Sequence, residues 1–308
     1  MDLSFIIPAQ NEEKSLKILH EQIISNINNY SYEIIFLNDG STDNTQEIME
    51  EIAASDKNVK IVEFRRNFGK SAALQSGFDI AMGNIVFTMD ADLQDDPAEI
   101  PNFIKRINEG FDLVAGWKQK RKDPLSKTIP SKLFNFVTSK LFKLKLHDYN
   151  CGFKAYRNEV VKSISIYGEL HRYIPALAKA QGFSVCEIPI VHHKREFGKS
   201  KYGAKRLVRG FLDLLTVNMI TKYARSPLYL FGLSGMIISF LGFATTIYLS
   251  IMKIFFGMSL SNRPLLVMGV LLIVVGIQLI SIGLIGEFIV YLNNRKEPIR
   301  SKEQRVKD

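Results

Sequence analysis

Two aspartates separated by one residue, Asp90 and Asp92, form the strongest chemical signal in the sequence. On an extended backbone alternate side chains point the same way, so this spacing predicts two carboxylates on one side of the chain. Neighbouring carboxylates repel each other unless a cation lies between them. A hard divalent ion such as Mg²⁺ or Mn²⁺ takes oxygen ligands and also binds a diphosphate. The pair therefore predicts a metal site that handles a phosphorylated substrate.

Alternating strand and helix patterns surround this pair. Strands are expected at 3–8, 32–37, 59–64, 84–89 and 111–115, and helices at about 12–28, 43–54, 71–82 and 97–108. Such alternation is typical of a doubly wound, mostly parallel α/β sheet. Ligands of these sheets bind at the carboxyl ends of the strands, where polar residues follow three of the predicted strands. These polar stretches are 8–13, 38–41 and 90–97.

Other polar residues in these regions have simpler interpretations. For Asp95 and Asp96, which precede a proline, helix capping is favoured over metal ligation. The run Gly69-Lys70-Ser71 resembles the end of a P-loop but lacks the glycine five residues earlier that a P-loop needs. His192 and His193 are adjacent, so on a strand they face opposite ways, and structural or substrate-facing roles are favoured over a metal site.

Charge is distributed unevenly along the 308 residues. Residues 1–117 hold 9 basic and 20 acidic side chains, whereas residues 118–308 hold 31 basic and 11 acidic ones. A basic excess indicates nucleic acid or an anionic membrane surface as partner. Residues 226–252 and 264–286 carry no charge and are long enough to cross a bilayer as helices. The sequence therefore predicts a lipid bilayer as partner, and no nucleic acid.

The flanking charges predict an orientation. Nine basic residues lie in 194–225 and six in 293–308, whereas the loop between the two apolar segments holds only Lys253 and Arg263. The positive-inside rule places both termini in the cytoplasm, as expected for a multi-pass protein of the cytoplasmic (inner) membrane. The basic amphipathic stretch 118–146 predicts docking on an anionic lipid surface.

Within the apolar segments, four residues have specific interpretations. Glu287 is interpreted as an interfacial residue close to the basic tail rather than as an intramembrane site. Gly276, Gly283 and Gly286 would allow close approach of another helix in the membrane, which admits a homo-oligomer.

Four stretches carry a family resemblance: Pro8–Glu13, Asn38–Ser41, Met89–Pro97 and Arg195–Tyr202. Together they resemble family 2 glycosyltransferases, in the branch of the dolichyl-phosphate mannose synthases and bactoprenol-phosphate glucosyltransferases. The resemblance covers about residues 1–225, and the two apolar segments resemble the bacterial glucosyltransferase branch. It implies a GT-A fold, with Mg²⁺ or Mn²⁺ as cofactor. The implied reaction is inverting transfer of one sugar from a nucleotide-diphosphate sugar to a polyprenyl phosphate such as undecaprenyl or dolichyl phosphate.

The resemblance also assigns roles by motif position. Metal ligands are expected at Asp90, Asp92 and Gln94, and catalytic residues at Asp92, Asp148 and Arg195. Donor-binding residues are expected at Pro8, Gln10, Glu12, Asp39, Gly40, Ser41, Lys70, Asp90, Ala91, Gln94 and Lys118. Acceptor- or phosphate-binding residues are expected at Arg121, Arg195, Ser200 and Lys201. The expected domains are a catalytic domain at 1–203, an amphipathic juxtamembrane helix at 204–225, a transmembrane hairpin at 226–292 and a basic cytoplasmic tail at 293–308.

Some choices stay open at this point. Dolichyl-phosphate mannose synthases often carry an aromatic residue in place of Gln10 and an arginine near Lys118, so the base and the sugar of the donor stay open. UDP-glucose is the first choice of donor and GDP-mannose the second. The acceptor phosphate is mostly a dianion at neutral pH, so no strong base is required. Asp148 either contacts the acceptor or the sugar, or stabilises the turn before Gly152.

Two other functions were weighed. A non-catalytic membrane-anchored scaffold that binds nucleotide sugars would not need acidic residues at several strand ends. A processive polysaccharide synthase shares the fold but usually carries a Gln-x-x-Arg-Trp motif. That motif is missing, because the only tryptophan is Trp117.

Overall fold

The computed structural model describes residues 1–27, 29–119, 135, 137–193, 205–224, 226–257, 259 and 264–294, with the backbone alone for 205–211, 293 and 294. Two compact units make up the chain, Met1–Val217 and Asn218–Asp308.

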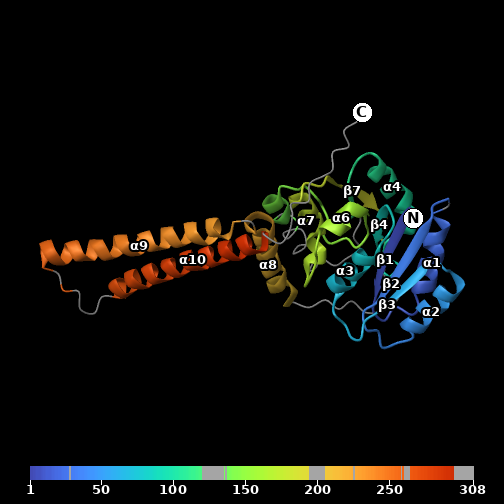
Figure 1. The fold of residues 1–308 in the computed structure, drawn as a ribbon, viewed down its shortest axis with the longest axis horizontal. Coiled ribbons are helices and arrows are strands. Elements are labelled where there is room, and N and C mark those ends of the chain that lie inside the picture. The colour runs from blue at the N-terminus through green and yellow to red at the C-terminus, as the bar shows by residue number, and fades with distance from the viewer. Residues whose placement is uncertain are drawn as a thin grey trace. The chain divides into compact units, whose positions relative to one another are not determined.

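A seven-stranded sheet forms the centre of the first unit (Figure 1). Its strands are β1 (Leu3–Ala9), β2 (Tyr32–Asn38), β3 (Val59–Glu63), β4 (Ile85–Thr88), β5 (Leu113–Lys118), β6 (Lys154–Arg157) and β7 (Val185–Ile190). The spatial order is β3-β2-β1-β4-β6-β5-β7. Only β6 runs antiparallel to its neighbours among the described strands. The predicted mostly parallel α/β sheet is therefore confirmed.

Helices cover both faces of this sheet. They are α1 (Leu16–Ser25), α2 (Thr45–Ser55), α3 (Lys70–Ile80), the 3₁₀-helix η1 (Pro97–Glu99), α4 (Ile100–Asn108), α6 (Asn158–Ser163), the 3₁₀-helix η2 (Leu170–Tyr173) and α7 (Ile174–Ala180). Apolar residues of α1, α2 and α4 pack into one core with β1, β2 and β4. On the opposite face, Gly77 of α3 packs against Ile6 and Leu37.

The core beneath β4 is aromatic. Phe5, Phe87, Phe103 and Phe153 are all fully buried. The ring centroids of Phe5 and Phe87 lie 5.0 Å apart, and those of Phe103 and Phe153 lie 4.3 Å apart. Burial of such a side chain stabilises the fold by about 1.5–3 kcal/mol. The end of β4, where the conspicuous aspartates begin, therefore rests on a rigid support.

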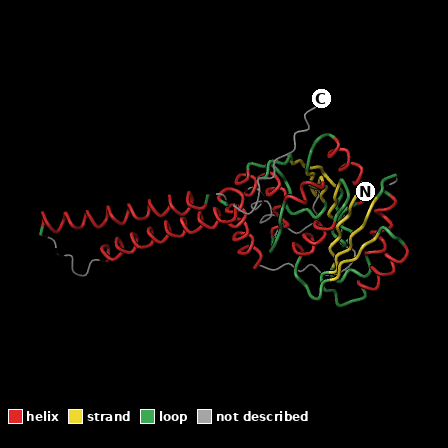
Figure 2. The backbone as a smooth tube through the Cα atoms, in the orientation of Figure 1, coloured by secondary structure: helices red, strands yellow, loops and turns green. Residues whose placement is uncertain are grey.

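The second unit contains two long helices that lie side by side (Figure 2). These are α9 (Pro227–Phe256) and α10 (Pro264–Asn294), and Pro227–Phe256 and Pro264–Leu292 are long and apolar enough to cross a membrane. A Cβ on Gly235 would lie 2.5 Å from the carbonyl oxygen of Gly276, and one on Gly242 would lie 2.6 Å from that of Gly269. Glycines thus allow the two backbones to touch.

The glycines that we expected to serve a second chain are used within this hairpin. Gly276 faces Ser239 and Gly235, Gly283 faces Leu228 and Phe231, and Gly286 faces Pro227. The close helix packing predicted from these three glycines is therefore made with α9 of the same chain, and a homo-oligomer stays a prediction.

Glu287 has a specific partner inside the hairpin. Its Oε2 accepts a hydrogen bond from the backbone amide of Leu228 at 3.3 Å, at the first turn of α9. A carboxylate is favourable at a helix N-terminus, where amide groups lack partners within the helix. The basic tail that we expected beside Glu287 lies outside the described residues.

A further helix, α8 (Lys205–Asn218), ends the first unit and continues into a π-helical turn at Met219–Tyr223. Leu214 and Val217 are buried, whereas Leu212 and Leu215 are about half exposed. The buried and exposed sides of this helix fit the predicted amphipathic juxtamembrane helix at 204–225. Its position next to a membrane stays a prediction.

Candidate active site

The carboxyl ends of β1, β2 and β4 meet at one edge of the sheet, because these strands are parallel neighbours. The polar stretches after Ala9, Asn38 and Thr88 therefore come together, as predicted. Strand β6 adds a fourth stretch, since its antiparallel direction brings its first residue, Lys154, opposite Thr88. Residues 148–154 thus reach the same edge from a distant part of the sequence.

Asp39 organises the loop between β3 and α3. Its Oδ1 accepts a hydrogen bond from the amide of Phe68 at 2.7 Å, and its Oδ2 accepts one from Gly69 at 3.1 Å. Gly40 has a φ of +65°, and a Cβ there would lie 2.5 Å from the backbone of Arg66. These two predicted donor-binding residues therefore hold one wall of the site in place.

The stretch that follows β1 is tied to the one that follows β2. The amide of Asn11 donates to Ser41 Oγ at 3.0 Å, and Asn11 Oδ1 accepts from the amide of Thr42 at 2.8 Å. The amide of Glu12 donates to Thr45 Oγ1 at 2.9 Å. Helix α1 consequently begins at Leu16 rather than at residue 12 as expected. The predicted residues Pro8, Gln10 and Glu12 are half-buried beside this junction.

Of the two conspicuous aspartates, Asp92 lies in a turn and Asp90 directly precedes it, so they do not share an extended strand as their spacing predicted. β4 ends at Thr88, Ala91 and Asp92 form a turn, and Leu93 has a φ of +58°. Asp92 Oδ1 accepts a hydrogen bond from the amide of Gln94 at 3.2 Å. The turn nevertheless keeps Asp90, Asp92 and Gln94 together at the edge of the sheet.

Asp90 interacts with several lysines at this edge, namely Lys70, Lys118 and Lys154. Its Oδ1 forms an ion pair with Lys70 Nζ, and its carboxylate lies directly against Gly152, where only a glycine leaves room for it. Burial opposes ionisation of Asp90, but the charges of Lys70 and Lys118 outweigh this effect and hold the pKa of Asp90 below its usual value. Asp90 is therefore an ionised carboxylate at neutral pH.

These residues fit a divalent ion that completes its coordination with substrate. In the described part of the chain, no three His, Cys, Asp or Glu side chains form a ready-made metal centre. Mg²⁺ and Mn²⁺ are typically held by one or two carboxylates together with phosphate oxygens of the substrate. Asp90 and Asp92 offer carboxylate oxygens, and Gln94 offers an amide oxygen. This set of hard oxygen ligands suits such an ion.

Asp95 does not cap a helix, which corrects one of the two capping predictions. It is buried, and its Oδ1 lies 3.0 Å from Lys118 Nζ and 3.9 Å from His192 Nδ1. Burial opposes the charged form of both partners, yet each holds the other ionised, so the pKa of Asp95 is lowered and that of Lys118 is raised. Asp96 does cap, because its side chain accepts a hydrogen bond from the amide of Ala98 at 2.9 Å.

The two adjacent histidines diverge, as expected for strand neighbours. His192 Nε2 lies 3.5 Å from the side-chain amide of Gln94, and His193 Nε2 lies 3.2 Å from Asp96 Oδ2. Each histidine thus supports a different part of the loop after β4, and they do not share one metal site.

Lys154 also lies at this edge, although its sequence context did not predict a role there. This lysine is 3% exposed, and its Nζ donates to the carbonyl oxygen of Cys151. Burial lowers its pKa, while the charges of Asp148 and Asp90 act to raise it. Asp148 itself is buried and accepts a hydrogen bond from the amide of Asn150 at 3.0 Å, which is the turn role left open for it.

His171 was also missed. Its Nδ1 lies 2.9 Å from Ser71 Oγ, which in addition accepts the backbone amide of His171 at 3.1 Å. Burial lowers the pKa of His171 well below its usual value, and Lys70, Arg172 and Lys154 lower it further. A neutral imidazole therefore anchors the first turn of α3. These residues are a hundred positions apart, so no local pattern could predict the contact.

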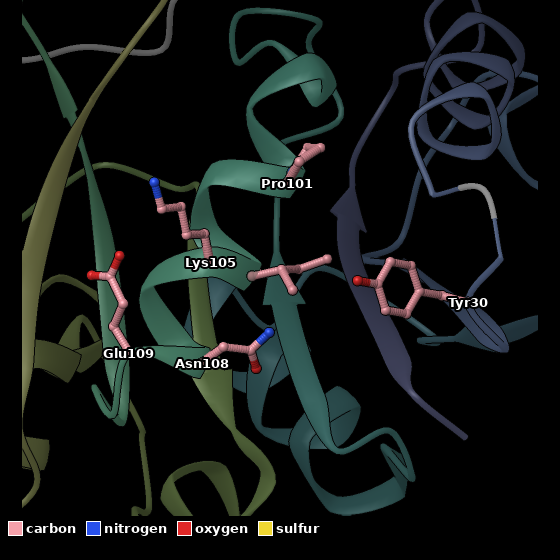
Figure 3. Close-up of a pocket in the computed structure, with 6 residues that line it drawn as sticks. Tyr30, Pro101, Lys105, Asn108 and Glu109 are labelled. Atoms are coloured by element: carbon pink, nitrogen blue, oxygen red, sulfur yellow. The ribbon is translucent and has the colours of Figure 1, made fainter.

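Four predicted residues, Arg121, Arg195, Ser200 and Lys201, lie outside the described residues, so their roles remain predictions. A hollow of about 450 Å³ lies elsewhere, between Tyr30 and α4 (Figure 3). Tyr30 precedes β2, and Glu109, which also lines the hollow, precedes β5. The hollow is thus at the amino ends of the strands, away from Asp90 and Lys70.

Comparison with known proteins agrees with this geometry. The sequence profile described as "Glycosyl transferase family 2" matches residues 4–165, which include β1 to β6 and the turn with Asp90. This chain belongs to glycosyl transferase family 2. The resemblance inferred from the four stretches is thereby confirmed, and the chain is a glycosyltransferase.

Curated relatives of this glycosyltransferase match along nearly its whole length. It is 37% identical to the dodecaprenyl-phosphate galacturonate synthase of Rhizobium johnstonii, over 94% of this chain and 88% of the relative. It is 35% identical to the undecaprenyl-phosphate 4-deoxy-4-formamido-L-arabinose transferase of Pseudomonas fluorescens, over 96% of this chain and 87% of the relative. Both names describe sugar transfer to a polyprenyl phosphate.

Solved structures support the fold class of the family 2 domain. The glucosyl-3-phosphoglycerate synthase of Mycobacterium tuberculosis, solved in complex with Mn²⁺, UDP and phosphoglyceric acid, superposes with a TM-score of 0.56. The match covers 71% of this chain and 78% of the other at 18% identity. The expected GT-A fold, followed by two candidate membrane helices, is therefore confirmed.

Proposed function

We propose that this glycosyltransferase transfers one sugar from a nucleotide-diphosphate sugar to a polyprenyl phosphate, with inversion at the sugar carbon. The observation that carries the proposal is the turn with Asp90, Asp92 and Gln94 at the carboxyl edge of the sheet. Relatives that match over nearly the whole chain and have polyprenyl phosphates in their names support the acceptor class. The two apolar helices would keep the enzyme where such lipids are found.

The side chains at the edge bind and orient two anionic substrates. Asp90, Asp92 and Gln94 would hold Mg²⁺ or Mn²⁺, which neutralises charge on the leaving diphosphate when bound. Asp39 and Gly40 position the loop that forms the wall of the nucleoside site. The acceptor phosphate is a nucleophile without a strong base, so positioning and electrostatic stabilisation supply most of the rate increase.

The donor sugar is the finer part of the proposal. Galacturonate carries a carboxylate and 4-deoxy-4-formamido-L-arabinose carries a formamide, and both occur in the names of relatives. We therefore place UDP-linked sugars of these two kinds ahead of UDP-glucose and GDP-mannose, the first and second choices from sequence alone.

The distribution of basic residues supports one side of the membrane for the reaction. Fifteen lysines and arginines flank the apolar segments at 194–225 and 293–308. We propose on this basis that both termini and the catalytic domain lie on the cytoplasmic side. Arg121, Arg195, Ser200 and Lys201 are proposed to bind the acceptor or donor phosphates, and Asp148 to support the neighbouring turn.

A transfer assay tests the proposal. Purified full-length protein in detergent is mixed with undecaprenyl phosphate, a panel of radiolabelled UDP- and GDP-sugars, and Mn²⁺, Mg²⁺ or EDTA. We expect label in the lipid phase from one donor, and no label with EDTA. Donor binding or hydrolysis without lipid labelling would show that the acceptor is wrong. A polymeric product would favour a processive synthase, and failure of every donor to bind would favour the scaffold function.

A further inference from the structure

Lys70 forms an ion pair with the carboxylate of Asp90, which is one of the expected metal ligands. Its Nζ pairs with Asp90 Oδ1, while the same carboxylate lies against Gly152 on another side. A divalent cation bound to the same carboxylate would lie close to the ammonium group of Lys70, and the two cations repel each other. Metal binding at Asp90 therefore disfavours the ion pair and favours movement of Lys70 away from Asp90.

The backbone around Lys70 is fixed on both sides. Asp39 accepts the amide of Gly69 at 3.1 Å, and Ser71 Oγ is held by His171 through contacts of 2.9 and 3.1 Å. The side chains of Lys70 and Asp90 are each 31% exposed. The flexible lysine side chain can consequently exchange partners without any movement of the helix that carries it.

After leaving Asp90, the ammonium group of Lys70 would need another anion as its partner. Lys70 is the first residue of α3, where the amide groups of the first turn have no partners within the helix. The positive end of the helix and the released ammonium group together favour an anion near this turn. A diphosphate held by a metal ion at Asp90 would lie within the same edge of the sheet.

We propose that Lys70 is an exchangeable countercharge: it neutralises Asp90 before substrate binds and transfers to the donor diphosphate when a metal ion takes its place. This inference rests on the proposed function, since it assumes that a metal ion and a nucleotide-diphosphate sugar bind at this edge. Its consequence is that metal and nucleotide bind synergistically. Each ligand favours the arrangement in which Lys70 has left Asp90, so each raises the affinity for the other by the same factor.

The test measures binding rather than catalysis. The full-length protein in detergent is titrated with Mn²⁺ by electron paramagnetic resonance, with and without UDP, and with GDP in parallel. Isothermal titration calorimetry then gives nucleotide affinity with and without Mn²⁺. The variants are Lys70→Gln, which removes the charge, and Lys70→Arg, which keeps it. Lys17→Gln is the matched control, because Lys17 forms an exposed ion pair with Glu51 at 2.5 Å, remote from the motif.

For Lys70→Gln we expect Mn²⁺ without nucleotide to bind about threefold to tenfold more tightly, because it no longer competes with an ion pair. Nucleotide with Mn²⁺ should bind more weakly by a similar factor, so the coupling between the two ligands falls. Lys70→Arg should restore wild-type behaviour, and Lys17→Gln should never differ from wild type. Because Lys70 is partly exposed, we expect all variants to fold, which unchanged melting temperatures would verify.

Other results separate the two proposals. If wild type binds Mn²⁺ and nucleotide synergistically but Lys70→Gln shows the same coupling, the exchange is refuted and the proposed function stands. If Lys70→Gln weakens nucleotide binding but leaves the affinity for Mn²⁺ without nucleotide unchanged, Lys70 is only a fixed phosphate ligand and the exchange is again refuted. If wild type binds neither Mn²⁺ nor any nucleotide, the proposed function itself fails. Should Lys70→Gln not fold, Lys70→Met gives the same comparison.

Discussion

At the carboxyl edge of the sheet, Gly152 leaves room for the carboxylate of Asp90, whereas in the hairpin Gly235 leaves room for the backbone of Gly276. Both glycines are required for close packing, but their neighbours differ. At the sheet edge the neighbour is a charge that must be positioned for chemistry. In the hairpin the neighbour is another helix, and the two backbones pack directly against each other within apolar segments.

The carboxylates of the two units differ in the same way. Asp90 is paired with the side chain of Lys70, which can move, whereas Glu287 accepts a hydrogen bond from the backbone amide of Leu228, which cannot. An exchangeable partner suits a binding site, and a fixed partner suits a structural role. Substitutions at the edge should therefore change activity more than stability, and substitutions in the hairpin should do the reverse.

The largest effect is expected for the aspartates themselves. Asp90→Ala or Asp92→Ala should lower transfer at least about a hundredfold, because electrostatic stabilisation of the leaving diphosphate is lost. Lipid labelling in the transfer assay measures this loss. Asp96→Ala is the control from the same loop, since it removes a cap and should reduce stability by about 1 kcal/mol while activity remains. Near-normal transfer by both aspartate variants would remove the metal assignment.

A smaller but still large loss is expected for Gly152→Ala. The added methyl group would occupy the space of the Asp90 carboxylate, so the side chain must leave its position. We expect transfer to fall about tenfold to a hundredfold, with a matching loss of Mn²⁺ affinity. Gly182→Ala is the control: at a φ of +95° with no atom within 4 Å of the new Cβ, it strains the backbone without touching the site. Equal activity losses in the two variants would mean that strain, not the position of Asp90, is responsible.

The sequence predicts the location of the site better than its details. Alternating strand and helix patterns fix which loops reach the carboxyl edge, so Asp39, Asp90, Asp92 and Gln94 are predicted together. The turn at Leu93 is not predictable, because a non-glycine residue with positive φ leaves no signal in its identity.

Long-range contacts explain the remaining failures. Lys154 reaches the site only because β6 inserts antiparallel between β4 and β5, an order that no local pattern specifies. Asp95 was assigned to a cap because its neighbour Lys118 comes from another strand. Likewise, the glycines of α10 predict close helix packing, but they cannot tell whether the partner helix belongs to the same chain.

A moderate effect on stability is expected in the hairpin. Gly276→Leu should push α10 away from Ser239 and Gly235 and lower stability by about 1–3 kcal/mol, as overpacking does in closely packed interiors. Thermal unfolding in detergent measures the change, and nucleotide affinity should stay at its wild-type value. Val274→Leu, at a position that is 46% exposed, is the matched control and should leave both quantities unchanged. A tenfold loss of nucleotide affinity in Gly276→Leu would contradict the separation of roles between the units.

The smallest effect is expected in the pH dependence of stability of the first unit. Burial and the charges of Lys70, Arg172 and Lys154 lower the pKa of His171, while Asp90 acts in the opposite direction. Below about pH 6.5, the usual pKa of histidine, the unfolded chain binds a proton that the folded chain excludes, so stability falls as pH decreases. Between pH 7.5 and 5.5 we expect wild type to lose about 1 kcal/mol more than His171→Gln. The exposed His193→Gln, which lies outside this cluster, should follow the wild-type curve. Melting temperatures across this range measure the difference. If the stability of the wild type and of His171→Gln fell by the same amount with decreasing pH, the folded protein would not hold the imidazole beside Ser71 in its neutral form.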